Sequence, residues 1–163
     1  MMKQRWLSLF VENDIGVLAR ISGLFAGKLY NLDSLTVGTT EDITISRITI
    51  SLTSDDQTFE QIKKQLNRSV EVIKVVDLTD TAIYRKEFMF VKIHECSEQD
   101  IMKLTYIKEV FQTRVIDYNT SVVLIESVQR SERNDALIQL LKDNFSGRLE
   151  VVRGGSVAIE GIH

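Results

Sequence analysis

Residues 6–25, WLSLFVENDIGVLARISGLF, indicate a strand, a turn and a helix near the start of the chain. Residues 6–11 are a β-prone run that is apolar enough for a central strand, and residues 12–16 are typical turn formers. Beyond the turn, apolar residues recur at spacings of three and four, which predicts an amphipathic helix. These apolar residues are Val17, Leu18, Ile21, Leu24, Phe25 and Leu29.

The predicted helix also carries small residues, namely Ala19, Gly23, Ala26 and Gly27. A glycine in a helix interior costs about 1 kcal/mol relative to alanine. We therefore expect these glycines to permit close packing against a sheet or a second subunit.

The rest of the first half predicts three more strands and one more helix. Residues 32–37 and 70–76 are two of the strands, and residues 38–42 are a loop. The third strand shows apolar residues alternating with polar ones, at Ile48, Ile50 and Leu52. The second helix shows helical spacing at Phe59, Ile62 and Leu66, with Val70 at the edge of the pattern. The element order is βαββαβ.

The second half predicts the same order. Residues 87–93 are a strand, and Ser97 with Asp100 forms a capping-box pattern before a helix that carries Ile101, Leu104, Ile107 and Phe111. Residues 115–118 and 121–125 indicate a hairpin around Asn119 and Thr120. A helix begins near Ser131 and carries Ala136, Leu137, Leu140 and Leu141. The closing strand lies at residues 151–152 or 157–159, and the pattern leaves both open.

Two βαββαβ units predict an α+β protein of two ferredoxin-like modules, each an antiparallel sheet with helices on one face. The periodicity breaks between Asp77 and Tyr84, so we assign residues 1–78 to the first module and 84–163 to the second. Modules of this size are small for independent stability, and their exposed sheet edges favour pairing with another copy. We therefore expect a homodimer or a higher oligomer.

Composition excludes several classes of function. The chain has 163 residues with a formal net charge of -3, which argues against nucleic acid as the main partner. Its single cysteine, Cys96, cannot form an internal disulfide. The sequence has no signal-peptide pattern and no apolar run near the ~20 residues of a membrane span. We expect a cytoplasmic protein that does not bind a membrane.

The turn before the first helix is the leading candidate site. A helix N-terminus offers free backbone N–H groups and a partial positive charge, so it can hold a carboxylate. Gly16 lets a ligand approach the backbone closely, and the Asn13 and Asn31 amides each offer a donor and an acceptor. Together they could bind the two charged groups of a free amino acid. Alternatively, Asn13, Asp14 and Gly16 form only a turn and a helix cap.

The wider sequence resembles a known family. Residues 12–25, ENDIGVLARISGLF, followed by residues 30–37, YNLDSLTV, are similar to the opening ACT domain of the small, regulatory subunits of acetohydroxyacid (acetolactate) synthase. Residues 46–50, 60–66 and 90–93 look similar too. The resemblance covers the whole chain, more strongly up to about residue 95, and implies an N-terminal ACT domain and a C-terminal ACT-like domain.

This resemblance implies a non-catalytic protein that binds and activates the large catalytic subunit. It also implies feedback inhibition, typically by valine, through a site between two paired ACT domains, with the turn of one subunit facing Asn31 of the other. The implied effector-site residues are Asn13, Asp14, Ile15, Gly16, Val17, Asn31 and Gln61. Leu29 stands where many members have glycine, which puts the strength of effector binding in doubt.

The resemblance assigns thiamine diphosphate, Mg and FAD to the catalytic subunit and no cofactor to this chain. Other residue patterns offer weaker sites: His94 with Cys96 lacks the further ligands of a zinc site, and two carboxylate pairs lie in predicted loops without an apolar pocket. These pairs are Glu41 with Asp42 and Asp55 with Asp56. Arg153-Gly154-Gly155 lacks a phosphate-loop frame, and His163 is the last residue.

Two other functions remain open. The chain could be an ACT-type regulator of a different enzyme or of transcription, although no helix-turn-helix or basic arm is visible. It could also be a small enzyme on a ferredoxin-like scaffold, but the sequence contains no catalytic constellation.

Overall fold

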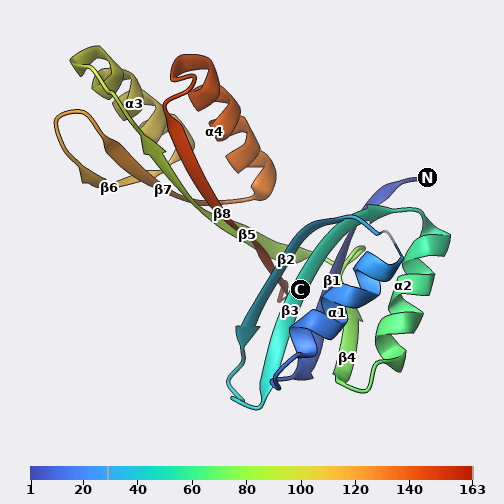
Figure 1. Ribbon diagram of the computed structural model, residues 1–163. Helices are drawn as coiled ribbons and strands as arrows, with labels where there is room; N and C mark the ends of the chain where they lie inside the picture. Colours follow the sequence, from blue (N-terminus) through green and yellow to red (C-terminus); the bar gives the residue numbers. More distant parts are fainter. Residues whose placement is uncertain (29, 163) are drawn as a thin grey trace. The chain divides into compact units, whose positions relative to one another are not determined.

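The computed structural model describes residues 1–28 and 30–162, so the expectations for Leu29 and His163 lie outside the described residues. The chain divides into two compact units. The first comprises residues 1–84 together with the last residues from Ser156, and the second comprises residues 85–155. Each unit is built on a four-stranded sheet (Figure 1).

The first sheet has the strand order β2-β3-β1-β4, and its described strand pairs are antiparallel. Its elements are β1 (Lys3–Glu12), α1 (Val17–Gly27), β2 (Leu32–Thr39), β3 (Ile45–Ser54), α2 (Asp56–Arg68) and β4 (Val72–Asp77). The order of elements and the position of both helices on one face confirm the predicted ferredoxin-like unit (Figure 1).

The core of this unit lies between the sheet and the two helices. Alternate residues of the central strands β1 and β3 point toward the helices, as the two-residue period of a strand requires. The two helices point apolar residues toward the sheet at the predicted spacings of three and four residues. The core members include Leu7, Leu9, Ile48, Ile50, Val17, Ile21, Phe25, Phe59, Ile62 and Leu66.

The opposite face of the sheet is polar but also buried. Ser8, Thr49 and Ser51 are almost inaccessible to solvent. A second hydrophobic cluster, separate from the main core, consists of Trp6, Leu78 and Ala158.

The last residues of the chain form part of this unit. The Ser156 N–H donates to Ser34 Oγ at 3.0 Å, and Thr36 Oγ1 donates to the Ser156 carbonyl at 2.9 Å. The sequence assigned residues 84–163 to the second module, whereas the structure places residues from Ser156 in the first unit. Contacts more than 100 residues apart leave no periodic pattern that would reveal this from sequence.

The second sheet has the order β6-β7-β5-β8. Its elements are β5 (Ile83–Ile93), α3 (Glu98–Phe111), β6 (Arg114–Tyr118), β7 (Val123–Gln129), α4 (Ser131–Asn144) and β8 (Leu149–Glu160). The hairpin around Asn119 is confirmed, because Asn119 Oδ1 accepts hydrogen bonds from the backbone N–H groups of Ser121 and Val122. One strand, β8, contains both of the segments that the sequence left open as the closing strand.

One expectation about the first unit was wrong, and another was contradicted for one of its two alternatives. Val70 belongs to neither α2 nor β4 and is 89% exposed, because α2 ends at Arg68 and β4 begins at Val72. Outside the backbone of their own helix and their chain neighbours, Gly23 and Gly27 have no described atom within 4 Å of where a Cβ would lie. Packing against the sheet of the same chain therefore does not require either glycine, and packing against a second subunit stays a prediction.

Helix starts differ in how they are capped. Asp55 Oδ1 accepts the Thr58 N–H at 2.6 Å at the start of α2. At α3, Ser97 and Asp100 form the predicted capping box, with reciprocal bonds of 3.2 and 2.9 Å. Helix α1 instead begins at Gly16, which has a left-handed φ of 84° and no side-chain cap among the described residues. Glycine adopts that backbone region without the steric cost of a Cβ.

Among the described residues, no helix combines the length and apolar character needed to cross a membrane.

The Asp100 carboxylate predicts a pH dependence of stability. Hydrogen bonds from the Ser97 backbone N–H and from Arg148 lower the pKa of Asp100 from 3.8 to about 2. A carboxyl with a lower pKa in the folded state stabilises the fold above its unfolded pKa and loses that contribution as pH falls through the folded pKa. In urea titrations, we expect the stability advantage of wild type over Asp100→Asn to shrink between about pH 4 and about pH 2. A constant difference across that range would contradict this assignment.

Two glycine substitutions are expected to change stability in opposite directions. Gly16→Ala should destabilise the fold by about 1–2 kcal/mol because of its left-handed backbone, and the new Cβ would lie 3.1 Å from Arg20 Nη1. Gly23→Ala is the matched control: it lies inside α1 with open space around it, and it should stabilise by about 1 kcal/mol. Chemical denaturation measures both, and a neutral Gly16→Ala variant would refute the strain argument.

Candidate functional site

Asn13, at the end of β1, is held by two hydrogen bonds to the loop before β3. Its backbone N–H donates to the Thr44 carbonyl at 2.8 Å, and its side-chain Nδ2 donates to the Ile43 carbonyl at 2.9 Å. The side-chain donor is therefore used within the chain. Asn13 Oδ1 has no hydrogen-bond partner within residues 1–28 and 30–162, and it remains an acceptor for a ligand.

The turn from Asp14 to Gly16 leads into the first turn of α1. The Val17 N–H makes a long bond of 3.3 Å to the Asp14 carbonyl, and the Arg20 N–H donates to the Gly16 carbonyl at 3.0 Å. Ile15 is fully exposed, whereas Val17 is only 3% exposed and packs in the core. Val17 was predicted as an effector-site residue, but its buried side chain cannot contact a ligand, so only its backbone can.

Arg20 is a candidate site residue that the sequence reasoning missed. It lies one helical turn after Gly16, and its Nη1 would be 3.1 Å from a Cβ at that glycine. Its Nε lies 2.5 Å from Glu71 Oε1. The spacing of four residues on the predicted helix is the signal that could have revealed it.

The partner carboxylate of Arg20 stays ionised. The backbone N–H of Glu71 itself, the Ser69 hydroxyl and the charge of Arg20 lower the pKa of Glu71. The ion pair with Glu71 thus holds the Arg20 guanidinium beside the α1 start, and the negative charge of Glu71 offsets its positive charge there.

Asn31 lies in a different part of the unit. It is exposed just before β2 and lines a cavity of about 180 Å³ together with Tyr30, Thr53 and Asp55. Ser54, which also lines this cavity, has a buried hydroxyl with no hydrogen-bond partner in the described part of the chain.

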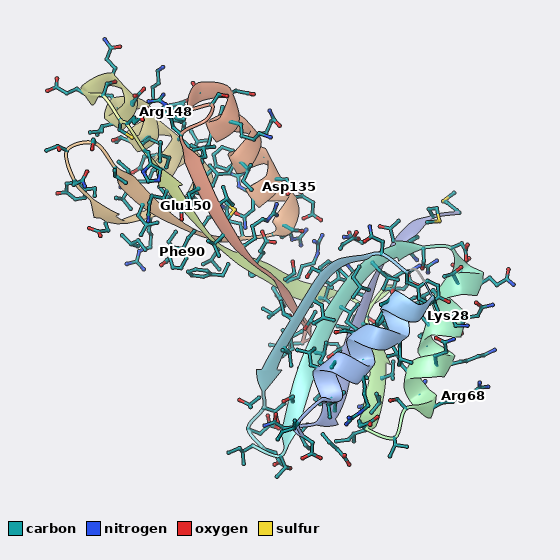
Figure 2. All side chains as sticks on the ribbon, viewed as in Figure 1. Lys28, Arg68, Phe90, Asp135, Arg148 and Glu150 are labelled. Carbon is teal, nitrogen blue, oxygen red and sulfur yellow. The ribbon has the colours of Figure 1, made fainter. Side chains whose placement is uncertain are left out.

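One chain does not bring the turn and Asn31 together. The 11 residues of α1 separate them by roughly 16 Å, at 1.5 Å per residue. Figure 2 shows Lys28 at the end of α1 and Arg68 at the end of α2, at opposite ends of the helix layer. Asn31 follows Lys28, whereas the turn lies near Glu71, which follows Arg68. The remaining predicted residue, Gln61, is exposed on α2.

The weaker candidates take part in structural contacts. His94 Nε2 lies 3.4 Å from Glu150 Oε2, and burial, followed by the charge of Asp100, raises the pKa of the Cys96 thiol. In the described ranges, no three His, Cys, Asp or Glu side chains are grouped closely enough to hold a metal ion.

The carboxylate pairs and the glycine-flanked arginine also have partners within the fold. Asp42 accepts from Thr44, and Asp56 pairs with Arg5 at 2.5 Å. Arg153 pairs with Glu87 and Asp135.

Comparison with known proteins matches both halves of the chain to one family. Residues 7–74 match the model of the acetolactate synthase small subunit-like ACT domain, and residues 86–162 match the model for the small subunit of acetolactate synthase.

Whole-chain relatives agree with these matches. The probable acetolactate synthase small subunit of Methanothermobacter thermautotrophicus is 38% identical over 94% of this chain and 90% of its own. The acetolactate synthase isozyme 3 small subunit of Escherichia coli is 35% identical over 96% and 94%.

A solved structure agrees as well. The crystal structure of the acetolactate synthase small subunit from Thermotoga maritima has a TM-score of 0.87 and 29% identity, covering 99% of both chains. With the family models matching both modules and relatives matching nearly the whole length, the chain belongs to the acetolactate synthase small subunits, whose N-terminal module is an ACT domain.

Proposed function

We propose that this chain binds and activates the catalytic large subunit of acetolactate synthase and makes it sensitive to valine or another branched-chain amino acid. The observation that carries the proposal is the start of α1, which has a left-handed glycine, no side-chain cap from the described part of the chain, and the Arg20 guanidinium alongside. Thiamine diphosphate, Mg and FAD belong to the catalytic subunit in this proposal, and this chain contributes no cofactor.

The α1 start suits both charged groups of a free amino acid. Its first-turn N–H groups and Arg20 face an incoming carboxylate, which the helix dipole also favours. Asn13 Oδ1, which accepts no hydrogen bond from a described residue, is an acceptor for the ammonium group. Because the Asn13 amide is fixed by its bond to the Ile43 carbonyl, it loses little freedom when a ligand binds.

A second copy of the chain completes this site. Strand register places the end of β2 near the end of β1, since Thr39 pairs with Ser46 and Ser46 pairs with Val11. Asn31 precedes the other end of β2. When two β2 edges pair antiparallel across a two-fold axis, Asn31 of one copy comes to the turn end of the other.

Regulation then follows from a shift between two arrangements. The amino acid binds across the dimer and favours the arrangement that has Asn31 close to the partner turn. The catalytic subunit prefers the other arrangement, so effector binding and activation oppose each other through a coupling free energy.

An activity assay tests the regulatory half of the proposal. The catalytic subunit is assayed alone and with this chain, each across a valine titration. We expect the chain to raise activity and valine to reverse that increase, with no valine effect on the catalytic subunit alone. Equal activity with and without the chain would refute activation.

Calorimetry tests the binding half. Asn31→Ala should weaken valine binding by about tenfold or more, because a hydrogen bond to a charged group contributes about 1.5–3 kcal/mol. Asn67→Ala, an exposed position on α2, is the matched control and should leave the affinity unchanged. If both variants bind valine like wild type, Asn31 is not part of the site.

A further inference from the structure

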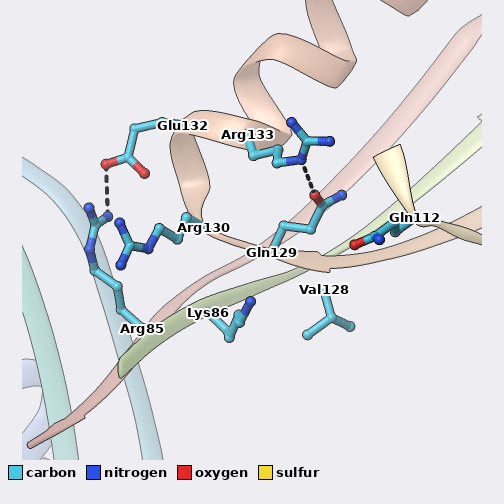
Figure 3. Close-up of a pocket in the computed structure, with 8 residues that line it drawn as sticks. All are labelled: Arg85, Lys86, Gln112, Val128, Gln129, Arg130, Glu132 and Arg133. Carbon is cyan, nitrogen blue, oxygen red and sulfur yellow. Dashed lines mark hydrogen bonds and ion pairs between the residues drawn. The ribbon is translucent and has the colours of Figure 1, made fainter. Parts of the chain in front are cut away.

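The second unit contains a cavity with a strongly basic lining. It has a volume of about 530 Å³ and lies between the start of β5, the end of β7 and the start of α4. Of the described side chains that line it, four are basic and one is acidic, in a chain whose formal net charge is -3. The basic residues are Arg85, Lys86, Arg130 and Arg133 (Figure 3).

Arg133 is fixed in place on this lining. Its Nε donates to Gln129 Oε1 at 2.8 Å, one Nη donates to the Val110 carbonyl at 2.8 Å, and the guanidinium stacks on Phe111.

A buried hydrogen-bond network fixes Gln129 in turn. Gln129 Nε2 donates to Ser127 Oγ, which donates to Asn134 Oδ1, and Asn134 Nδ2 donates to Glu87 Oε1. Glu87 itself is held by Arg153 at 2.8 Å. Gln129, Ser127, Asn134 and Glu87 are each at most 8% exposed. Their hydrogen bonds therefore fix Gln129, and through it Arg133, before any ligand binds.

The other basic residues supply charge. Arg85 pairs with Glu132 at 2.8 Å (Figure 3). Burial opposes ionisation of Glu132, but the hydrogen bond from Arg85 and the charges of Arg85 and Arg130 lower the pKa of Glu132. The side chains of Lys86 and Arg130 make no hydrogen bond or ion pair with another described residue, although the Arg130 carbonyl accepts from backbone N–H groups of α4. The lining therefore has positive charge that the described residues do not neutralise.

The volume of the cavity and the chemistry of its lining indicate the class of ligand. Its volume lies in the range of small-molecule sites, roughly 300–1,000 Å³, and exceeds what a single inorganic anion fills. Arginine and lysine side chains are the usual partners of phosphate groups. Val128, which is 49% exposed, offers an apolar surface on the same lining.

We infer that this cavity binds the phosphate group of a small organic phosphate, with Lys86, Arg130 and Arg133 around the phosphate and Val128 against the organic part. The site is separate from the amino-acid site proposed for the first unit, and it shares no residue with it. A failure of either proposal therefore leaves the other standing.

Calorimetry on the full chain tests this inference, with inorganic phosphate as the probe and sodium chloride added to hold ionic strength constant. We expect saturable phosphate binding that the double variant Lys86→Ala/Arg130→Ala weakens by about tenfold or more. Both side chains are exposed, so the fold should be retained. Lys103→Ala, which removes an exposed charge on α3, is the control and should bind phosphate like wild type.

A second variant is expected to tighten phosphate binding, so misfolding cannot account for its result. Glu132→Gln removes the one carboxylate of the lining and should tighten phosphate binding, which a damaged fold could not do. Absence of saturable binding up to about 20 mM phosphate, or unchanged affinity in the double variant, would overturn the inference. Succinate binding as tightly as phosphate would overturn the phosphate assignment.

Discussion

The first unit depends on the central strand β1, whose side chains alternate between two buried faces. Leu7 and Leu9 pack under the helices, while Trp6 and Ser8 are buried on the opposite face. A shift of one residue in the register of β1 would exchange these two sets and place serine in the apolar core. Burial on both faces therefore fixes the position at which β1 ends, and with it the position of the turn that starts α1.

That turn differs from the starts of the other helices in its backbone conformation. Asp55 and Ser97 satisfy backbone N–H groups at α2 and α3, and α4 follows the extended Arg130 without a side-chain cap among the described residues. Helix α1 follows a left-handed glycine. The uncapped N–H groups, the Asn13 oxygen and the Arg20 guanidinium all belong to one end of α1. Asn31 belongs to the other end, so the fold of one chain does not bring these groups together.

Most of the fold could be predicted from local patterns. The two-residue and 3.6-residue periods predicted the order of elements, and Ser97 with Asp100 predicted a capping box that the structure confirms. Apolar character alone misplaced Val70, because a single valine beside a helix end satisfies either period. The open space around Gly23 and Gly27 could not be predicted either, since a sequence does not show what lies opposite a small residue.

The candidate site was predicted only where it is local in sequence. Asn13 and Gly16 stand in one turn, and Asn31 was included for the hydrogen-bonding capacity of its amide, which the family resemblance supported. The interaction between Arg20 and Glu71 joins residues 51 positions apart and requires the three-dimensional arrangement. The basic lining of the second unit could not be predicted for the same reason. Lys86 lies on β5 and Arg130 lies between β7 and α4, so they appear as scattered charges in the sequence.

The packing of Ala158 with Trp6 and Leu78 has a consequence for synthesis of the protein. Ribosomes make the chain from its N-terminus, so the strands and helices of the first unit emerge well before the residues that finish it. Until the segment after Ser156 has been translated, the indole of Trp6 lacks one of its apolar neighbours. The module that begins the chain is thus completed last, and a nascent or prematurely terminated chain exposes an apolar surface that the finished protein conceals.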